Sequence, residues 1–150
     1  MTVRVATPAD ARAVAQLLHD FNEEFEDPTP GPDALAERLT SMLGRDDVVA
    51  LLAGDGPDGV ALLTFRPGVW DEGPVALLEE LYVKPGLRNR GIGTELLQRA
   101  FDAAREKGSR TFEINVDEED VDAQRFYERH GVTPIEPGRE YRAFYYSRRL

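Results

Sequence analysis

Residues 83–94 constrain the fold of this chain more than any other part of its sequence. They read Val83-Lys84-Pro85-Gly86-Leu87-Arg88-Asn89-Arg90-Gly91-Ile92-Gly93-Thr94. Before them, residues 75–83 form a mostly apolar run that is typical of a strand. After them, residues 91–107 carry apolar side chains at helical spacing and end at Gly108. The sequence therefore predicts a strand, a glycine-rich turn and a long helix in succession.

The composition of this turn is suited to holding an anion. N–H groups in the first turn of a helix have no internal partner, and the helix dipole places partial positive charge there. Gly91 and Gly93 leave room for a phosphate group, while Arg88 and Arg90 add positive charge. A P-loop is excluded because no Gly-Lys-Ser/Thr follows, and a dinucleotide fingerprint is weakened because its third glycine would fall at Leu96. A purely structural turn, whose glycines only permit tight geometry, is the alternative.

The other elements indicate an α/β chain. A first helix is predicted to begin at Pro8 and to fade at residues 27–32, where three prolines follow in close succession. Further helices are predicted at 33–43 and 121–130, and further strands at 3–6, 48–53, 60–65, 111–116, 132–135 and 141–147. This order predicts a mixed sheet of the α/β (α+β) class, with about seven strands and four flanking helices, in which the central β-α-β step is a right-handed crossover.

Size and composition limit the class of protein. A chain of 150 residues with 41% hydrophobic residues suits a single domain over residues 1–150. No apolar run approaches the ~20 residues of a membrane span, and no secretory signal precedes the first strand, so we expect a cytoplasmic protein without a membrane partner. The sequence has no cysteine and two histidines, which disfavours disulfides, a cysteine nucleophile and a metal site.

The net charge of -10 disfavours a nucleic-acid partner, because phosphate binding requires clustered Lys and Arg. A cationic partner is better matched to an acidic chain. The alternative is that the charge only keeps the protein in solution.

Three motifs together resemble the GNAT superfamily of N-acetyltransferases over essentially the whole chain. Arg88-x-x-Gly91-x-Gly93 is similar to the family signature for the pyrophosphate of coenzyme A (CoA), and the preceding Glu-Leu-Tyr-Val-Lys-Pro resembles its fourth strand. Ala123-x-x-Phe126-Tyr127-Glu128-x-x-Gly131 resembles its last helix. The resemblance implies the GNAT-like acyl-CoA N-acyltransferase fold, acetyl-CoA as co-substrate and an acetyltransferase activity.

The resemblance also implies which residues contact the cofactor. Main-chain groups on the strand are expected to hold the pantetheine arm, and the turn is expected to hold the pyrophosphate. The residues concerned are Leu81, Tyr82, Val83, Arg88, Asn89, Arg90, Gly91, Ile92, Gly93 and Thr94. Asp120 stands where many members carry an Asn near the cofactor; its carboxylate can accept a hydrogen bond, although negative charge close to phosphates is unfavourable.

Acetyl transfer to an amine requires a proton acceptor for the ammonium group and a proton donor for the departing thiolate. Glu79 and Glu80 interrupt the apolar strand, and alternation sends them to opposite faces unless a bulge intervenes. The pair resembles an acidic pair in spermidine/spermine-type acetyltransferases, which favours Glu79 as the base, through a water molecule, with Glu80 as the second choice. The alternative is that both acids only reach solvent.

Tyr127 aligns with the tyrosine that the family places near the sulfur of CoA, where a phenol can protonate the thiolate. Ordinary packing beside Phe126 is the alternative for this residue. Four acids near the end of the first helix provide either an acidic lip for a cationic substrate or a solvated helix end: Glu23, Glu24, Glu26 and Asp27.

The expected function is therefore acetyl transfer to a small cationic primary amine, with Glu23, Glu24 and Glu79 as substrate contacts. Polyamines, aminoglycoside-like amines and amino-acid derivatives are the classes considered. Two alternatives stay open: acetylation of protein N-termini or lysines, and a non-catalytic acyl-CoA sensor. A homodimer is common in the family that the chain resembles.

Overall fold

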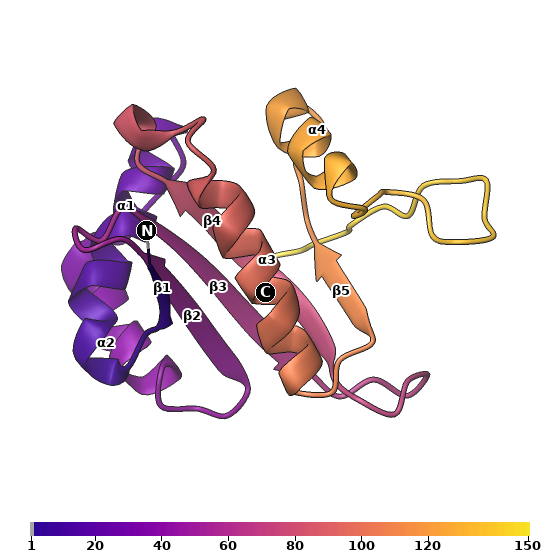
Figure 1. The fold of residues 1–150 in the computed structure, drawn as a ribbon, viewed down its shortest axis with the longest axis horizontal. Coiled ribbons are helices and arrows are strands. Elements are labelled where there is room, and N and C mark those ends of the chain that lie inside the picture. The colour runs from indigo at the N-terminus through magenta and orange to yellow at the C-terminus, as the bar shows by residue number, and fades with distance from the viewer. Residues whose placement is uncertain (1) are drawn as a thin grey trace. The chain divides into compact units, whose positions relative to one another are not determined.

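The structure is a computed structural model that describes residues 2–150, and it contains two compact units, the first ending at Phe112 and the second comprising Glu113–Leu150. The elements, in chain order, are β1 (Val3–Val5), the 3-10 turn η1 (Pro8–Asp10), α1 (Ala11–Glu24), α2 (Pro32–Met42), β2 (Val48–Ala53), β3 (Gly59–Arg66), β4 (Val75–Val83), the 3-10 turn η2 (Pro85–Leu87), α3 (Ile92–Glu106), β5 (Thr111–Ile114) and α4 (Val121–Arg129). The strand order is β1-β2-β3-β4-β5, and each of the first three pairs is antiparallel (Figure 1). The predicted mixed α/β fold is confirmed.

Helices α1 and α2 cover one face of the sheet in the first unit. Their side chains Val14 and Leu39 belong to one buried cluster with Ala50, Leu52 and Leu62 of β2 and β3. Successive residues of a strand point to opposite faces, so the residues between these positions face the other side of the sheet. Helix α3 lies on that side and crosses β2, β3 and β4 (Figure 1).

Gly59 shows how closely α3 approaches the sheet. A Cβ atom at this position would lie 2.9 Å from the carbonyl oxygen of Tyr82 and 3.0 Å from Cδ1 of Leu96. Leu96 and Leu97 of α3 are fully buried. A glycine is therefore needed at position 59 so that α3 can pack on β3 and β4 without displacing the β4 backbone.

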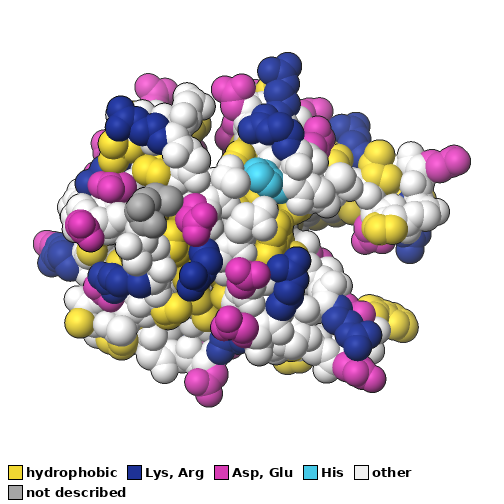
Figure 2. All heavy atoms as spheres, viewed as in Figure 1, with side chains coloured by type: hydrophobic (Ala, Val, Ile, Leu, Met, Phe, Trp, Pro, Cys, Tyr) yellow, Lys and Arg dark blue, Asp and Glu magenta, His cyan; other side chains and the backbone are white. Residues whose placement is uncertain are grey.

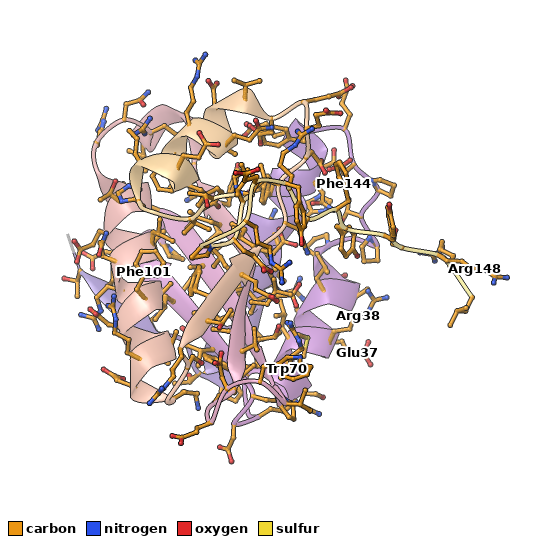
Figure 3. All side chains as sticks on the ribbon, turned by 90° about the vertical axis from the view of Figure 1, so that its right-hand side faces the viewer. Glu37, Arg38, Trp70, Phe101, Phe144 and Arg148 are labelled. Carbon is orange, nitrogen blue, oxygen red and sulfur yellow. The ribbon has the colours of Figure 1, made fainter. Side chains whose placement is uncertain are left out.

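The strands predicted at 132–135 and 141–147 are absent, so the sheet has five strands rather than about seven. One isolated bridge joins Ile135 and Arg142, and the side chains of Phe144 and Tyr146 are 69% and 88% exposed. Figure 3 shows Phe144 and Arg148 on a segment drawn without helix or strand. Strand propensity measures how well a residue fits a pleated, half-buried surface. The prediction was wrong here because these aromatic side chains are not buried against such a surface.

The surface combines charges of both signs. On the face shown in Figure 2, Lys and Arg side chains lie among Asp and Glu side chains, so the net charge of -10 is not gathered into one acidic patch there. Between Thr2 and Leu150, no helix has both the length and the apolar character needed to cross a membrane. The same described residues contain no group of three or more His, Asp or Glu side chains arranged to hold a metal ion.

Candidate active site

Strand β4 contains a β-bulge at Glu79. Leu62 of β3 pairs with Glu80, whereas Leu63 pairs with Leu78, so Glu79 is the extra residue on β4. Paired residues share a face of the sheet, and Leu62 lies on the face covered by α1 and α2. Glu80 therefore also lies on that face.

The bulge brings Glu79 to the same side. Thr64 is two residues after Leu62 on β3 and so faces the same side as Leu62. The Thr64 hydroxyl donates a hydrogen bond of 2.7 Å to Oε1 of Glu79. Regular alternation would have separated Glu79 and Glu80, but the bulge places both carboxylates on the face that α1 and α2 cover.

The two carboxylates have different environments. Glu79 is exposed and Glu80 is half-buried. Burial raises the pKa of Glu80 to about 7, and the nearby negative charges of Glu79 and Asp27 act in the same direction. A carboxyl group with such a pKa can hold or release a proton near neutral pH, which is the property required of a general base.

Three aromatic side chains pack together at the end of β4, on the face that α1 and α2 cover. The Phe21 ring of α1 stacks on the Tyr82 ring, with centroids 5.0 Å apart and planes 18° apart. Phe25 meets Phe21 edge to face at 5.3 Å and remains 48% exposed. Aromatic faces attract ammonium groups, and this attraction adds to that of the neighbouring carboxylates.

The turn between β4 and α3 has the conformation that an anion site needs. Asn89 and Gly91 have φ angles of 61° and 84°, both in the left-handed region. A Cβ atom at Gly91 would meet nothing within 4 Å, so the backbone conformation, rather than space, requires glycine there. Gly91 caps α3, whose first N–H groups have no partner within the helix. Together with the exposed side chain of Arg90, these donors fit the pyrophosphate of CoA.

Arg88 and Glu24 are paired with each other. The two terminal nitrogens of Arg88 donate hydrogen bonds of 2.8 and 2.7 Å to the two oxygens of Glu24. Nε of Arg88 donates to the carbonyl oxygen of Val83 at 2.9 Å. The hydrogen bonds from Arg88 hold the pKa of Glu24 below its usual value. The residue expected to contact the cofactor and the residue expected to contact the substrate thus contact one another.

Glu23, the second lip acid that was expected to contact the substrate, has a different neighbour from Glu24. Glu23 is exposed, and its Oε1 lies 3.9 Å from Nε2 of His19. Three of the four acids that were considered together in the sequence thus have different neighbours. Glu24 pairs with an arginine, Glu23 lies beside a histidine, and Asp27 influences Glu80.

The second unit contains two of the predicted site residues. Asp120 caps α4, and its Oδ1 accepts a hydrogen bond of 3.0 Å from the N–H of Ala123. Asp is among the preferred N-cap residues, so this position has a structural reason for its carboxylate. Tyr127 of α4 is buried, with its ring 5.2 Å from that of Phe126 in an edge-to-face contact. Contacts of Asp120 and Tyr127 with the cofactor stay predictions.

The sequence analysis left open whether a bulge occurs at Glu79 and Glu80, and it did not identify Thr64 as a partner of Glu79. A bulge is often marked by a glycine, but this one is formed by a glutamate. Thr64 lies on a neighbouring strand and has no motif around it. The contact between Glu24 and Arg88 joins residues 64 positions apart and likewise has no local signal.

The mixed α/β fold and the glycine-rich turn before α3 agree with one class of protein, the acyl-CoA-dependent acyltransferases. Residues 13–132 match the acetyltransferase (GNAT) family, and the chain therefore belongs to that family. The chain is an N-acetyltransferase. Members of the family use acetyl-CoA as the acetyl donor.

Three known proteins show the extent of the similarity. A candidate acetyltransferase of known crystal structure from Arthrobacter sp. FB24 is 54% identical, with a TM-score of 0.93 over 100% of this chain and 96% of that chain. The aminoglycoside N(6')-acetyltransferase type 1 of Stenotrophomonas maltophilia is 32% identical over 141 residues, which are 90% of this chain and 88% of that protein. The mycothiol acetyltransferase of Beutenbergia cavernae is 34% identical over 93 residues, 60% of this chain but only 30% of the relative.

Proposed function

We propose that this chain, acting as one domain over residues 1–150, transfers an acetyl group from acetyl-CoA directly to the primary amine of a small cationic molecule. The observation that carries the proposal is the bulge in β4, which places Glu79 and Glu80 on one face of the sheet. The relative from S. maltophilia is named as an aminoglycoside acetyltransferase, and aminoglycosides are small molecules with several ammonium groups.

The donor is held by the turn and by β4. The N–H groups from Gly91 to Thr94 and the guanidinium of Arg90 supply hydrogen bonds and positive charge to the pyrophosphate. The main chain of residues 81–83 is the proposed partner of the pantetheine arm, although the carbonyl of Val83 already accepts a hydrogen bond from Arg88. When bound, acetyl-CoA supplies an acetyl group activated as a thioester.

Glu80 is the proposed acceptor of the substrate proton because of its raised pKa. An alkylammonium has a pKa near ~10 and must lose a proton before its nitrogen can attack the thioester carbonyl. A carboxylate with a pKa raised to about 7 accepts that proton more readily than an ordinary glutamate. This assignment differs from the sequence-based preference for Glu79, which is instead held by Thr64 at 2.7 Å.

Glu79 contributes charge in this proposal. Its carboxylate attracts the ammonium group and, by repulsion, helps to raise the pKa of Glu80. The phenol of Tyr127 is proposed to donate a proton to the sulfur as the carbon–sulfur bond breaks. Glu23 remains a proposed contact for a second ammonium group, whereas Glu24 is engaged by Arg88.

A panel of amines tests this function. The wild type, incubated with acetyl-CoA, is expected to acetylate amines with several positive charges faster than monoamines, because Glu79, Glu80 and Asp27 favour a cation. Glu80→Gln should reduce kcat at pH 7 by about 10²-fold, the usual effect of losing a general base, and the rate should partly recover at higher pH.

Asp47→Asn is the matched control, because Asp47 forms an exposed ion pair with Arg45. If Glu79→Gln is inactive while Glu80→Gln retains full activity, the base is Glu79. If only peptide N-termini or lysines are acetylated, the small-amine proposal is wrong.

A further inference from the structure

The guanidinium of Arg88 connects the end of β4 with the end of α1. Its three nitrogens donate hydrogen bonds to Val83 and to both oxygens of Glu24. The guanidinium carbon also lies 5.5 Å from the centre of the Tyr82 ring, and the Tyr82 hydroxyl donates to Glu24 at 3.3 Å. Arg88 is therefore fixed by partners from two elements that are far apart in the sequence.

The geometry of this pair favours a defined position for Arg88. A planar guanidinium and a carboxylate that form two parallel hydrogen bonds restrict each other's orientation more than a single contact does. The Arg88 and Glu24 side chains are 37% and 28% exposed, so the pair is partly shielded from solvent. Screening therefore weakens it less than it weakens the exposed ion pairs of this chain.

Asn89, which follows Arg88, has a backbone conformation that the surrounding structure must hold in place. Asn89 has a φ angle of 61°, a left-handed conformation that costs a non-glycine residue free energy. Such a conformation persists where the surrounding structure fixes it. The hydrogen bonds of Arg88 fix the residue directly before Asn89, and Gly91 at the start of α3 follows two residues later.

We propose that Glu24 is a positioning residue for CoA: through Arg88 it holds the turn 88–94 in the conformation that binds the pyrophosphate. This inference rests on the proposed role of the turn in binding CoA. Glu24 then does not contact the amine, and the free positive charge for the phosphates comes from Arg90, which is exposed. A turn already in its binding conformation loses less conformational entropy when the ligand binds.

Two other roles for the same pair predict different changes in CoA binding and in KM for the amine. If Arg88 itself bound the pyrophosphate by its charge, Glu24 would compete with the ligand, and removing the Glu24 charge would tighten CoA binding. If Glu24 bound the amine, its removal would raise KM for the amine and leave CoA binding unchanged. Positioning predicts weaker CoA binding and an unchanged KM for the amine.

The test is calorimetric titration of CoA into the wild type, Glu24→Gln, Arg88→Met and the double variant, with KM for the amine measured alongside. Each single variant should raise Kd for CoA about tenfold, the effect of losing roughly one charge-assisted hydrogen bond. The double variant should be no weaker than the single variants, because both remove the same contact.

Asp47→Asn is the control. Asp47 accepts two hydrogen bonds of 2.7 Å from Arg45, so the variant breaks a similar ion pair away from the turn and should leave Kd unchanged. An unchanged or lower Kd in Glu24→Gln, or additive effects in the double variant, would overturn the positioning role. Failure of the folded wild type to bind CoA would instead refute the proposed function of the turn.

Discussion

Replacement of Glu80 by Gln should change how the stability of the protein depends on pH. The pKa of Glu80 is raised from 4.5 to about 7, mainly by burial. In the unfolded chain the carboxyl group loses its proton near its usual pKa, whereas in the folded protein it keeps the proton until about pH 7. Between these two values the folded state binds more protons, so its stability falls as pH rises.

The size of the effect follows from the pKa difference. At about 1.4 kcal/mol per pH unit, a difference between 4.5 and about 7 corresponds to about 3 kcal/mol for a fully buried group. Glu80 is only half-buried, and solvent screening reduces the expected value to about 1–2 kcal/mol. Glutamine preserves the shape of the side chain but has no charge to bury.

Urea denaturation of the wild type and Glu80→Gln measures this difference. At pH 8.5 the variant should be more stable than the wild type by about 1–2 kcal/mol, and at pH 4.5 the two should be nearly equal. Asp47→Asn is a control in which the pH dependence of stability should change in the opposite direction, because Arg45 holds the pKa of Asp47 below its usual value. The contribution of Asp47 is present above its unfolded pKa and is lost as pH falls through its folded pKa. A stability difference for Glu80→Gln that is the same at both pH values would refute the reasoning.

Three further variants test other parts of the site and fold. Tyr127→Phe keeps the packed ring but removes the hydroxyl, so kcat should fall by about 10²-fold while Kd for CoA changes little; unchanged turnover when chemistry is rate-limiting would leave Tyr127 with a packing role. Thr64→Val removes the hydrogen bond to Glu79, so KM for a cationic amine should rise in steady-state assays without an effect on CoA binding, and an unchanged KM would show that the hydrogen bond from Thr64 is not needed to orient Glu79 for the substrate. Gly59→Ala places a Cβ atom 2.9 Å from the Tyr82 carbonyl oxygen, so Tm should fall in thermal denaturation; an unchanged Tm would mean that α3 can move away from the sheet.

Buried elements with clear boundaries were predictable from the sequence. The strands at 48–53 and 75–83 have the predicted bounds, because their apolar residues are buried and turn residues flank them. The helix after the glycine-rich turn differs from its predicted bounds by one residue at each end. The strand prediction for residues 141–147 was wrong because the aromatic residues there have strand propensity but remain exposed in the structure.

The sequence indicates the local parts of the candidate site but not its long-range contacts. The glycine-rich turn and the acidic pair are both local patterns, so their residue types could be read directly. The face to which Glu79 points depends on a bulge, and a glutamate at this position gives no sequence signal for a bulge. The cap formed by Asp120 could have been found, since an Asp directly before a helix is a common N-cap.

Binding of CoA by the turn 88–94 is the central claim, and calorimetric titration of CoA into the purified, folded protein tests it most directly. We expect saturable binding by the wild type that weakens as salt is added, because positive charge and the helix N-terminus hold the pyrophosphate. Arg90→Glu reverses an exposed charge without altering a buried contact, and it should weaken the binding strongly. Absence of binding by the folded wild type at millimolar CoA, or equal affinity in Arg90→Glu, would contradict the claim.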